Sequence, residues 1–93
     1  MEERINETWK YLGGRKFYSK NGNYLGVELY SQNADNQPPV RLTCMCAEPL
    51  ADVLLESIWG CSLSQFVTVR WSSRKKKWYA FVREEWLKAV LGE

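Results

Sequence analysis

The residue types that most often perform chemistry in enzymes are scarce in this chain. Its 93 residues include no histidine, so the commonest general base is absent. The candidate nucleophiles are Cys44, Cys46 and Cys61, but a thiol needs a neighbouring base or a lowered pKa to react. Cys44 and Cys46 fall on the inward side of an apolar strand pattern, where free cysteine behaves as a small hydrophobe. We therefore predict that the protein is not an enzyme.

No metal or cofactor is predicted either. Zinc sites need four ligands, mostly Cys and His, and three cysteines supply too few unless a carboxylate is the fourth. Gly13-Gly14 precedes a strand pattern, whereas phosphate-binding glycine motifs follow a strand and open a helix. The carboxylates of Glu48, Asp52 and Glu56 recur every four residues. This spacing is typical of the solvated side of a helix rather than of an acid–base pair.

The stretch most suggestive of function is Phe66–Arg83, FVTVRWSSRKKKWYAFVR. Two β-branched and aromatic runs flank a basic turn, which is typical of a β-hairpin. A turn centred on Arg74 and Lys75 gives one wholly apolar face, because directly opposed residues share a face. That face is the predicted core of the hairpin: Val67, Val69, Trp71, Trp78, Ala80 and Val82. The opposite face carries Phe66, Thr68, Arg70, Tyr79, Phe81 and Arg83. A slip of one residue would mix the two faces, so we prefer this register.

Aromatic and basic side chains on one surface are typical of two kinds of binding site. Tyr, Trp, Phe and Arg are enriched at protein interfaces, and rings beside Lys and Arg also form platforms for single-stranded nucleic acid. The alternative is a turn that is basic because it is solvated and because Lys deters edge-strand aggregation. The net charge of +2 is a weak electrostatic footprint. The predicted partner-binding residues are Phe66, Arg70, Arg74, Lys75, Lys76, Lys77, Tyr79, Phe81 and Arg83.

Two elements are expected before this hairpin. Ile5, Trp9 and Leu12 have helical spacing, which predicts a helix over Glu2–Leu12 that ends at Gly13 and Gly14. Asn21-Gly22 is a strong two-residue turn signal, so Arg15–Tyr30 is expected to form a first hairpin. Its predicted pairs are Lys20–Asn23, Ser19–Tyr24, Tyr18–Leu25, Phe17–Gly26, Lys16–Val27 and Arg15–Glu28. Its predicted buried row is Leu25, Val27 and Leu29.

Four further segments complete the expected organisation. A polar loop over Ser31–Pro39 leads into a third strand over Val40–Cys46, which alternates in polarity. A helix over Glu48–Trp59 has Pro49 at its first position, and its expected core stripe is Leu50, Val53, Leu54 and Ile58. A last helix over Glu84–Leu91 has one apolar side, formed by Trp86, Leu87, Val90 and Leu91.

The order of elements is therefore α-β-β-β-α-β-β-α. Tight turns between most strands predict an α+β fold with a five-stranded antiparallel sheet and short helices packed on one face. The length suits a single domain over residues 1–93, and a hydrophobic fraction of 45% is ample for a core. The charged N-terminus, MEERINETWK, and the lack of a long apolar run predict a cytoplasmic protein with reduced cysteines.

The run NGNYLGVELY, followed by PPVRLTC, resembles a group of small domains of unknown function encoded by phages, plasmids and conjugative elements. The resemblance covers roughly residues 18–54 and does not extend to RWSSRKKKWYAFVR. It implies a mobile-element accessory protein that blocks a host defence system, as anti-CRISPR proteins do. Such a protein would act in the host cytoplasm by stoichiometric binding.

We accordingly predict a non-enzymatic binding module that inhibits a host defence protein or nucleoprotein complex. The alternative is a nucleic-acid-binding protein that uses the aromatic and basic face of the 66–83 hairpin. No membrane partner is expected. The same aromatic surface leaves open a homodimer seam.

Overall fold

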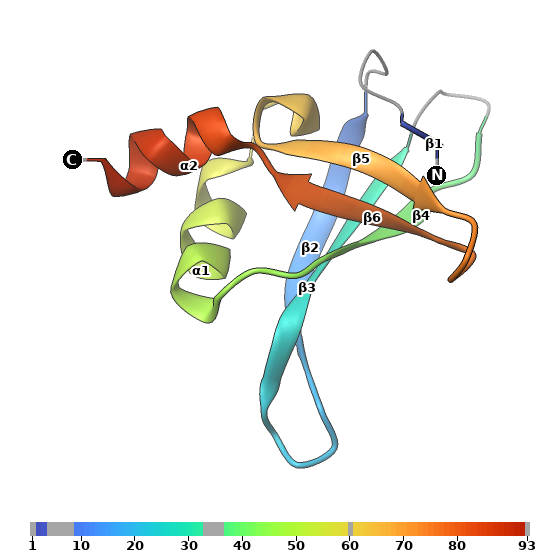
Figure 1. Cartoon of the computed structure of the whole chain (residues 1–93), viewed down its shortest axis with the longest axis horizontal. Coiled ribbons are helices and arrows are strands. Elements are labelled where there is room, and N and C mark those ends of the chain that lie inside the picture. Colours follow the sequence, from blue (N-terminus) through green and yellow to red (C-terminus); the bar gives the residue numbers. More distant parts are fainter. Residues whose placement is uncertain (1, 4–8, 33–36, 60, 93) are drawn as a thin grey trace.

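The computed structural model of the chain describes residues 2–3, 9–32, 37–59 and 61–92. Figure 1 shows its elements, which in chain order are β1 (Glu2–Glu3), β2 (Lys10–Tyr18), β3 (Tyr24–Gln32), β4 (Val40–Cys44), α1 (Glu48–Ser57), the 3-10 helix η1 (Leu63–Gln65), β5 (Val67–Ser72), β6 (Lys77–Val82) and α2 (Glu84–Leu91). None of the described helices is long and apolar enough to cross a membrane.

Within the described residues the strands form one sheet in the order β1-β5-β6-β4-β3-β2. Since β1 contributes only two residues, five strands carry the sheet, and the predicted α+β class is confirmed. The prediction that all strands are antiparallel is wrong, because β4 and β6 run parallel and pair Leu42 with Trp78 and Cys44 with Ala80. Parallel neighbours need a long crossover, and the segment containing α1 and β5 provides it.

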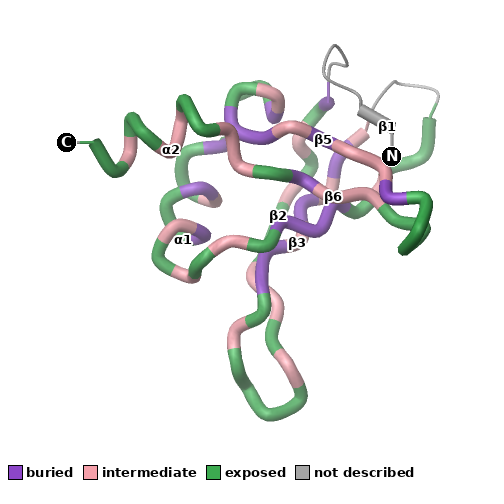
Figure 2. Tube along the Cα trace, in the orientation of Figure 1, coloured by how far each residue is buried: buried purple, intermediate pink, exposed green. Residues whose placement is uncertain are grey.

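The core lies between α1 and one face of the sheet, which we call the covered face. Val27, Leu29 and Leu42 point into it and are fully buried, as are Ala51 and Leu54 of α1. Figure 2 shows this buried region at the centre of the sheet and along one side of α1. Alternate residues of the same strands therefore point to the opposite face, where no described helix lies.

The predicted helix over Glu2–Leu12 is wrong. Glu2–Glu3 form β1, and residues 10–12 open β2, while residues 4–8 lie outside the described part of the chain. Trp9 is buried and contacts Trp78 edge-on, with ring centroids 5.4 Å apart. Leu12, which the helix would have buried, is exposed. Gly13 continues the strand at a register shift, with a φ of 145° that favours glycine, and so does not end a helix.

The first hairpin forms as predicted near its base but not near its tip. Arg15 pairs with Glu28 and Phe17 with Gly26, but Tyr18 then pairs with Tyr24 instead of Leu25. This shift leaves Leu25 as an extra residue in β3, and its side chain is 44% exposed. The predicted pairs Lys20–Asn23, Ser19–Tyr24 and Tyr18–Leu25 are therefore wrong, as is the burial of Leu25. The shift places Tyr24 against the core, where its hydroxyl donates to the Cys46 carbonyl at 2.6 Å, while the turn beyond it extends away from the core (Figure 1).

Both predicted C-terminal helices are present. α1 begins at Glu48 with Pro49 in its first turn, as predicted. Of the expected core stripe, Leu54 and the C-cap residue Ile58 are buried as predicted, together with Ala51. Leu50 and Val53 are not part of it, because they line a groove between α1 and α2. α2 spans Glu84–Leu91 as predicted, but none of its residues is buried. It extends beyond the end of the sheet (Figure 1), so α1 alone among the described helices covers a sheet face.

Candidate functional site: the outer face of the sheet

The face of the sheet opposite α1 carries most of the exposed aromatic and basic side chains of the strands. We call it the outer face and define it by residues that alternate along the strands with those of the covered face: Arg15, Phe17, Glu28, Tyr30, Arg41, Thr43, Arg70, Lys77, Tyr79 and Phe81. Thr43 at its centre is buried among these side chains. Strand pairing places Glu28 beside Thr43, Thr43 beside Tyr79 and Tyr79 beside Arg70. These side chains form one continuous surface across β2, β3, β4, β6 and β5.

A carboxylate organises the β2–β3–β4 side of this surface. Arg15 Nε donates to Glu28 Oε1 at 3.2 Å, and the Tyr30 hydroxyl donates to the same oxygen at 3.0 Å. Arg41 Nη1 donates to Glu28 Oε2 at 3.4 Å. Only 12% of the Glu28 side chain is exposed. One shielded carboxylate thus holds two arginines and one tyrosine ring across the face.

The pKa of Glu28 reflects these contacts. Burial raises it, but hydrogen bonds from Tyr30 and Arg15 and the charge of Arg41 outweigh that effect, so the pKa lies below its ordinary value. The carboxylate is therefore ionised at neutral pH and cannot donate a proton there. With two arginines beside it, the cluster keeps a net positive charge.

Cations also lie over the rings on the β6–β5 side. Arg70 Cζ is 5.8 Å from the centroid of the Phe81 ring, and Lys77 Nζ is 5.4 Å from that of Tyr79. The Tyr79 and Phe81 rings are tilted by only 32° relative to one another, with centroids 6.3 Å apart. The two rings therefore face roughly the same way, and Phe81 remains 48% exposed.

The outer face carries more cations than carboxylates. Among the side chains that the structure describes, Glu28 is the one carboxylate on the outer face. The other carboxylates whose side chains the structure describes belong to the two helices: Glu48, Asp52, Glu56, Glu84 and Glu85. Glu3 of β1 is the strand neighbour of Arg70 at the edge of the sheet. The described side chains of the outer face are therefore cationic in sum, although the total charge of the chain is near neutral.

The structure divides the predicted site residues into three groups. Arg70, Lys77, Tyr79 and Phe81 lie on the outer face, and the predicted pairs Trp71–Trp78, Val69–Ala80 and Val67–Val82 are all present. Arg74, Lys75 and Lys76 form the second group and lie in the exposed β5–β6 turn.

Phe66 and Arg83 make contacts away from this surface. The prediction that Phe66 points outward is wrong, because β5 starts one residue later and the ring is buried, 5.5 Å from that of Trp86. Arg83 Nε donates to the carbonyl oxygen of Ser64 at 2.6 Å, and the backbone N–H of Arg83 donates to the Phe66 carbonyl at 2.8 Å. These contacts fasten the start of α2 to η1 and β5.

The predicted partner-binding residues do not include the part of the outer face formed by β2, β3 and β4. Arg15, Glu28, Tyr30 and Arg41 are distant from the 66–83 hairpin in sequence and reach it only through the parallel β4–β6 pair. A partial signal was present. Alternation in the strands placed Glu28 opposite Arg15 and put Arg41 and Thr43 on the side away from the core, but nothing local indicated that β4 would lie against β6.

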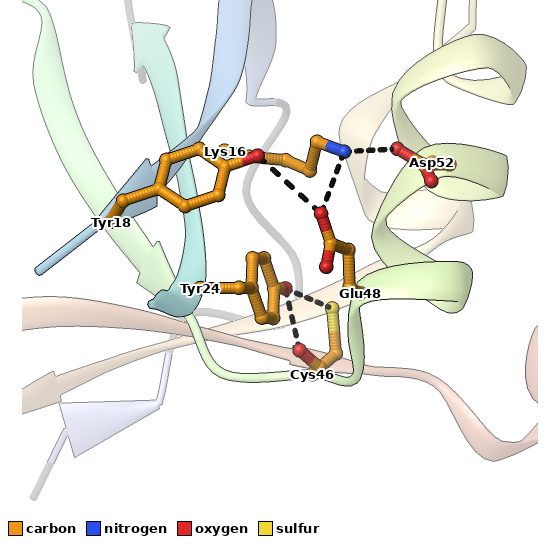
Figure 3. A network of polar contacts seen from close by, with 6 residues as sticks. All are labelled: Lys16, Tyr18, Tyr24, Cys46, Glu48 and Asp52. Carbon is orange, nitrogen blue, oxygen red and sulfur yellow. Dashed lines mark hydrogen bonds and ion pairs between the residues drawn. The ribbon is translucent and has the colours of Figure 1, made fainter. Parts of the chain in front are cut away.

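A second polar cluster joins the first hairpin to α1, and Figure 3 shows it. Lys16 Nζ lies 3.1 Å from Glu48 Oε2 and 2.8 Å from Asp52 Oδ1, while the Tyr18 hydroxyl donates to Glu48 Oε2 at 3.4 Å. Hydrogen bonds to Asp52 and Glu48 raise the pKa of Lys16. This lysine stays protonated, so it is not a general base, and the two carboxylates act as its ion-pair partners.

The cysteines beside this cluster differ in environment. Cys44 is fully buried on the covered face, as predicted, and its hydrogen bond to Cys46 and its burial raise its pKa. Cys46 lies beyond the end of β4 and is half-buried, with Sγ 4.0 Å from the Tyr24 hydroxyl. Tyr24 donates to the Cys46 carbonyl at 2.6 Å. The hydrogen bond from Cys44 lowers the pKa of Cys46 to about 7.

An apolar groove separates α1 from α2, with a volume of about 320 Å³. The residues that line it are Ala47, Pro49, Leu50, Val53, Val90 and Leu91. No polar group in this set fixes the orientation of a ligand. Within residues 2–3, 9–32, 37–59 and 61–92, no group of three or more His, Cys, Asp or Glu side chains is arranged to hold a metal ion.

Comparisons with known proteins identified no relative of this chain. A scan against protein-family models, a search of curated proteins and a search of solved structures each returned no match for this chain.

Proposed function

We propose that this protein is a non-enzymatic binding module whose contact surface is the outer face of the sheet. The observation that carries the proposal is that half-exposed aromatic rings and cations form one continuous surface on the face of the sheet that no described helix covers. Aromatic residues and arginine are the types most enriched at binding hot spots. Contacts among the side chains already hold them in place, which lowers the entropic cost of binding.

The two titratable clusters support binding rather than catalysis. Glu28 is ionised and bound by two arginines, and Lys16 is protonated between two carboxylates. Neither group can exchange a proton near neutral pH, which is what a general acid or base must do. The partner that fits the outer face presents negative charge, because the surface is cationic. That this partner is a host defence protein or nucleoprotein complex rests on the resemblance of residues 18–54 to mobile-element proteins.

The test compares what three immobilised forms of the full chain capture from a bacterial lysate. These are the unmodified protein, a Tyr79→Ala/Phe81→Ala variant and a Trp59→Ala variant. Trp59 is a matched control because it is 65% exposed but follows the C-cap of α1, where its ring contacts Tyr11 rather than the outer face. We expect the same partner with the unmodified protein and with Trp59→Ala, and its loss with the double variant. Circular dichroism and thermal unfolding establish that all three are folded.

A partner captured equally by the double variant would contradict the proposal, because the binding surface would then lie elsewhere. Turnover of a substrate by the unmodified chain would contradict the non-enzymatic part.

A further inference from the structure

We propose that the outer face binds single-stranded nucleic acid, with bases stacked on Tyr79 and Phe81 and phosphates contacted by Arg41, Arg70 and Lys77. This inference rests on the proposed function, since it names the partner of the same surface. It extends the site beyond the 66–83 hairpin to β4. The parallel pairing of β4 with β6 places Arg41 beside the strand that carries Tyr79 and Phe81.

The distribution of charge favours a polyanion over a protein partner. Lysine, aspartate and glutamate are depleted at protein–protein interfaces, where arginine is enriched, whereas interfaces with nucleic acid are more polar and much more positively charged as a whole. On this face, arginines and a lysine occupy the central strands β4, β6 and β5. Glu48, Asp52, Glu56, Glu84 and Glu85 belong to the helices, so they do not repel a strand laid across β4 and β6. Glu3 of β1 pairs with Arg70 at the edge of the sheet, which places the proposed strand path on the β4–β6 side of Arg70.

Glu28 contributes by positioning two arginines. Its carboxylate holds the guanidinium groups of Arg15 and Arg41 at 3.2 and 3.4 Å, although these side chains are 69% and 59% exposed. Each guanidinium has five N–H donors, so donors remain for a phosphate after the contact with Glu28. The carboxylate itself is only 12% exposed, which shields an approaching phosphate from it.

The rings provide the sequence-independent part of the site. Tyr79 and Phe81 are two residues apart on β6 and face roughly the same way, which suits two successive bases. Arg70 and Lys77 lie over these rings now, and an exposed cation–π contact is weaker than base stacking. An incoming base therefore displaces the exposed Lys77 from Tyr79, and its ammonium group remains within reach of the adjoining phosphate. Arg70 is only partly exposed and stays beside Phe81, whose ring is 48% exposed.

A single strand fits this surface better than a duplex. Stacking needs an exposed base face, and paired bases in a helix do not offer one. Reading a duplex through its major groove requires a protruding helix or a two-stranded ribbon. The outer face is an open sheet without a described helix on it.

The test measures binding of the full chain to fluorescein-labelled oligo(dT), oligo(rU) and a duplex of matched length by fluorescence anisotropy at low salt. We expect both single strands to bind more tightly than the duplex. If about three phosphates are contacted, the logarithm of the association constant should fall with the logarithm of salt concentration with a slope of about −2. Equal or tighter binding of the duplex would overturn the single-strand inference.

Matched variants locate the site. Phe81→Ala should weaken single-strand binding by about tenfold or more, the loss expected for one stacked base, while Trp59→Ala should leave it unchanged. Arg41→Gln and Lys77→Gln should each reduce the salt slope by about 0.7, the value for one phosphate contact on a single strand. Lys88→Gln is the cation control, because Lys88 is an exposed residue of α2. Equal losses in target and control variants would overturn the assignment of the site.

Failure of this inference is distinguishable from failure of the proposed function. If oligonucleotides do not bind at low salt, but a lysate partner is still captured through Tyr79 and Phe81 after nuclease treatment, the nucleic-acid inference is overturned. The binding module then stands with a protein partner. If neither oligonucleotides nor a lysate partner depend on these two rings, both are overturned.

Discussion

The two faces of the sheet are made by alternate residues of the same strands, yet they are held together differently. On the covered face, Val27 and Leu29 are fully buried under α1. On the outer face, Glu28 and Tyr30 of the same strand are connected by hydrogen bonds and ion pairs. Apolar burial stabilises the fold in proportion to the area removed from water, whereas exposed ion pairs contribute little. The covered face should therefore determine stability, and the outer face should be free to serve binding.

The largest expected effect is on the covered side. Leu54→Ala removes a fully buried side chain of α1 and should lower the free energy of unfolding by about 2–5 kcal/mol, because it leaves a cavity. Urea denaturation followed by tryptophan fluorescence measures this. The neighbouring change Val53→Ala is the control and should cost less than about 1 kcal/mol, since Val53 faces the groove and is partly exposed. Equal costs for the two changes would place the core elsewhere.

The next effect concerns the centre of the outer face. Glu28→Gln removes the charge that pairs with Arg15 and Arg41 and should lower the free energy of unfolding by about 1 kcal/mol at neutral pH. The same urea experiment measures it. Asp52→Asn, an exposed member of the second cluster, is the comparison for a solvated carboxylate and should cost less. A loss for Glu28→Gln as large as that for Leu54→Ala would remove the distinction between the two faces.

The pH dependence of stability gives an independent measure of the Glu28 cluster. Because the pKa of Glu28 is lower in the folded protein than in the unfolded chain, its contribution is present above the unfolded pKa of about 4.3 and is lost as the pH falls through the folded pKa. The difference in unfolding free energy between the unmodified protein and Glu28→Gln should therefore shrink below a pH of about 4. A difference that stays constant down to acid pH would show that the charge is not responsible.

The smallest structural perturbation is chemical labelling of the thiols. Cys46 should be alkylated by iodoacetamide in the folded protein, at a rate that rises as the pH passes through about 7. Cys44, which is fully buried on the covered face, should react only on unfolding. Peptide mapping by mass spectrometry separates the two, and exposed Cys61 serves as the internal reference. Alkylation of Cys44 at the rate of Cys61 would show that the covered face is open to solvent.

The β5–β6 hairpin was the most predictable part of the fold. Its register followed from the alternation of residues 67–82, since one register alone buries a wholly apolar face. The faces of Arg70, Lys77, Tyr79 and Phe81 followed from the same pattern. The alternation ends at Phe66, where the backbone adopts helical angles, so the prediction for that ring was wrong.

The first hairpin shows where local signals become insufficient. Asn21-Gly22 correctly indicated a turn, and Gly22 has a φ of 87°, but the bulge at Leu25 was not predictable from the turn residues. The bulge brings Tyr24 against the core and the Cys46 carbonyl, a tertiary contact that the turn residues do not encode. The N-terminal error has the same origin, because Trp9 and Leu12 are compatible with either a helix or a strand until their neighbours are known.

By itself, the sequence determined the α+β class, the bounds of α2, the start of α1 and the division of residues 67–82 between two faces. These features depend on periodicity, turns and capping, all of which are local. The tertiary structure alone decided that β4 runs parallel to β6, and with it that Arg41, Glu28 and Arg15 join Tyr79 and Arg70 on one surface. The physical reason is that strand adjacency depends on how the α1 crossover packs on the sheet, and no pattern within a single strand specifies its neighbour.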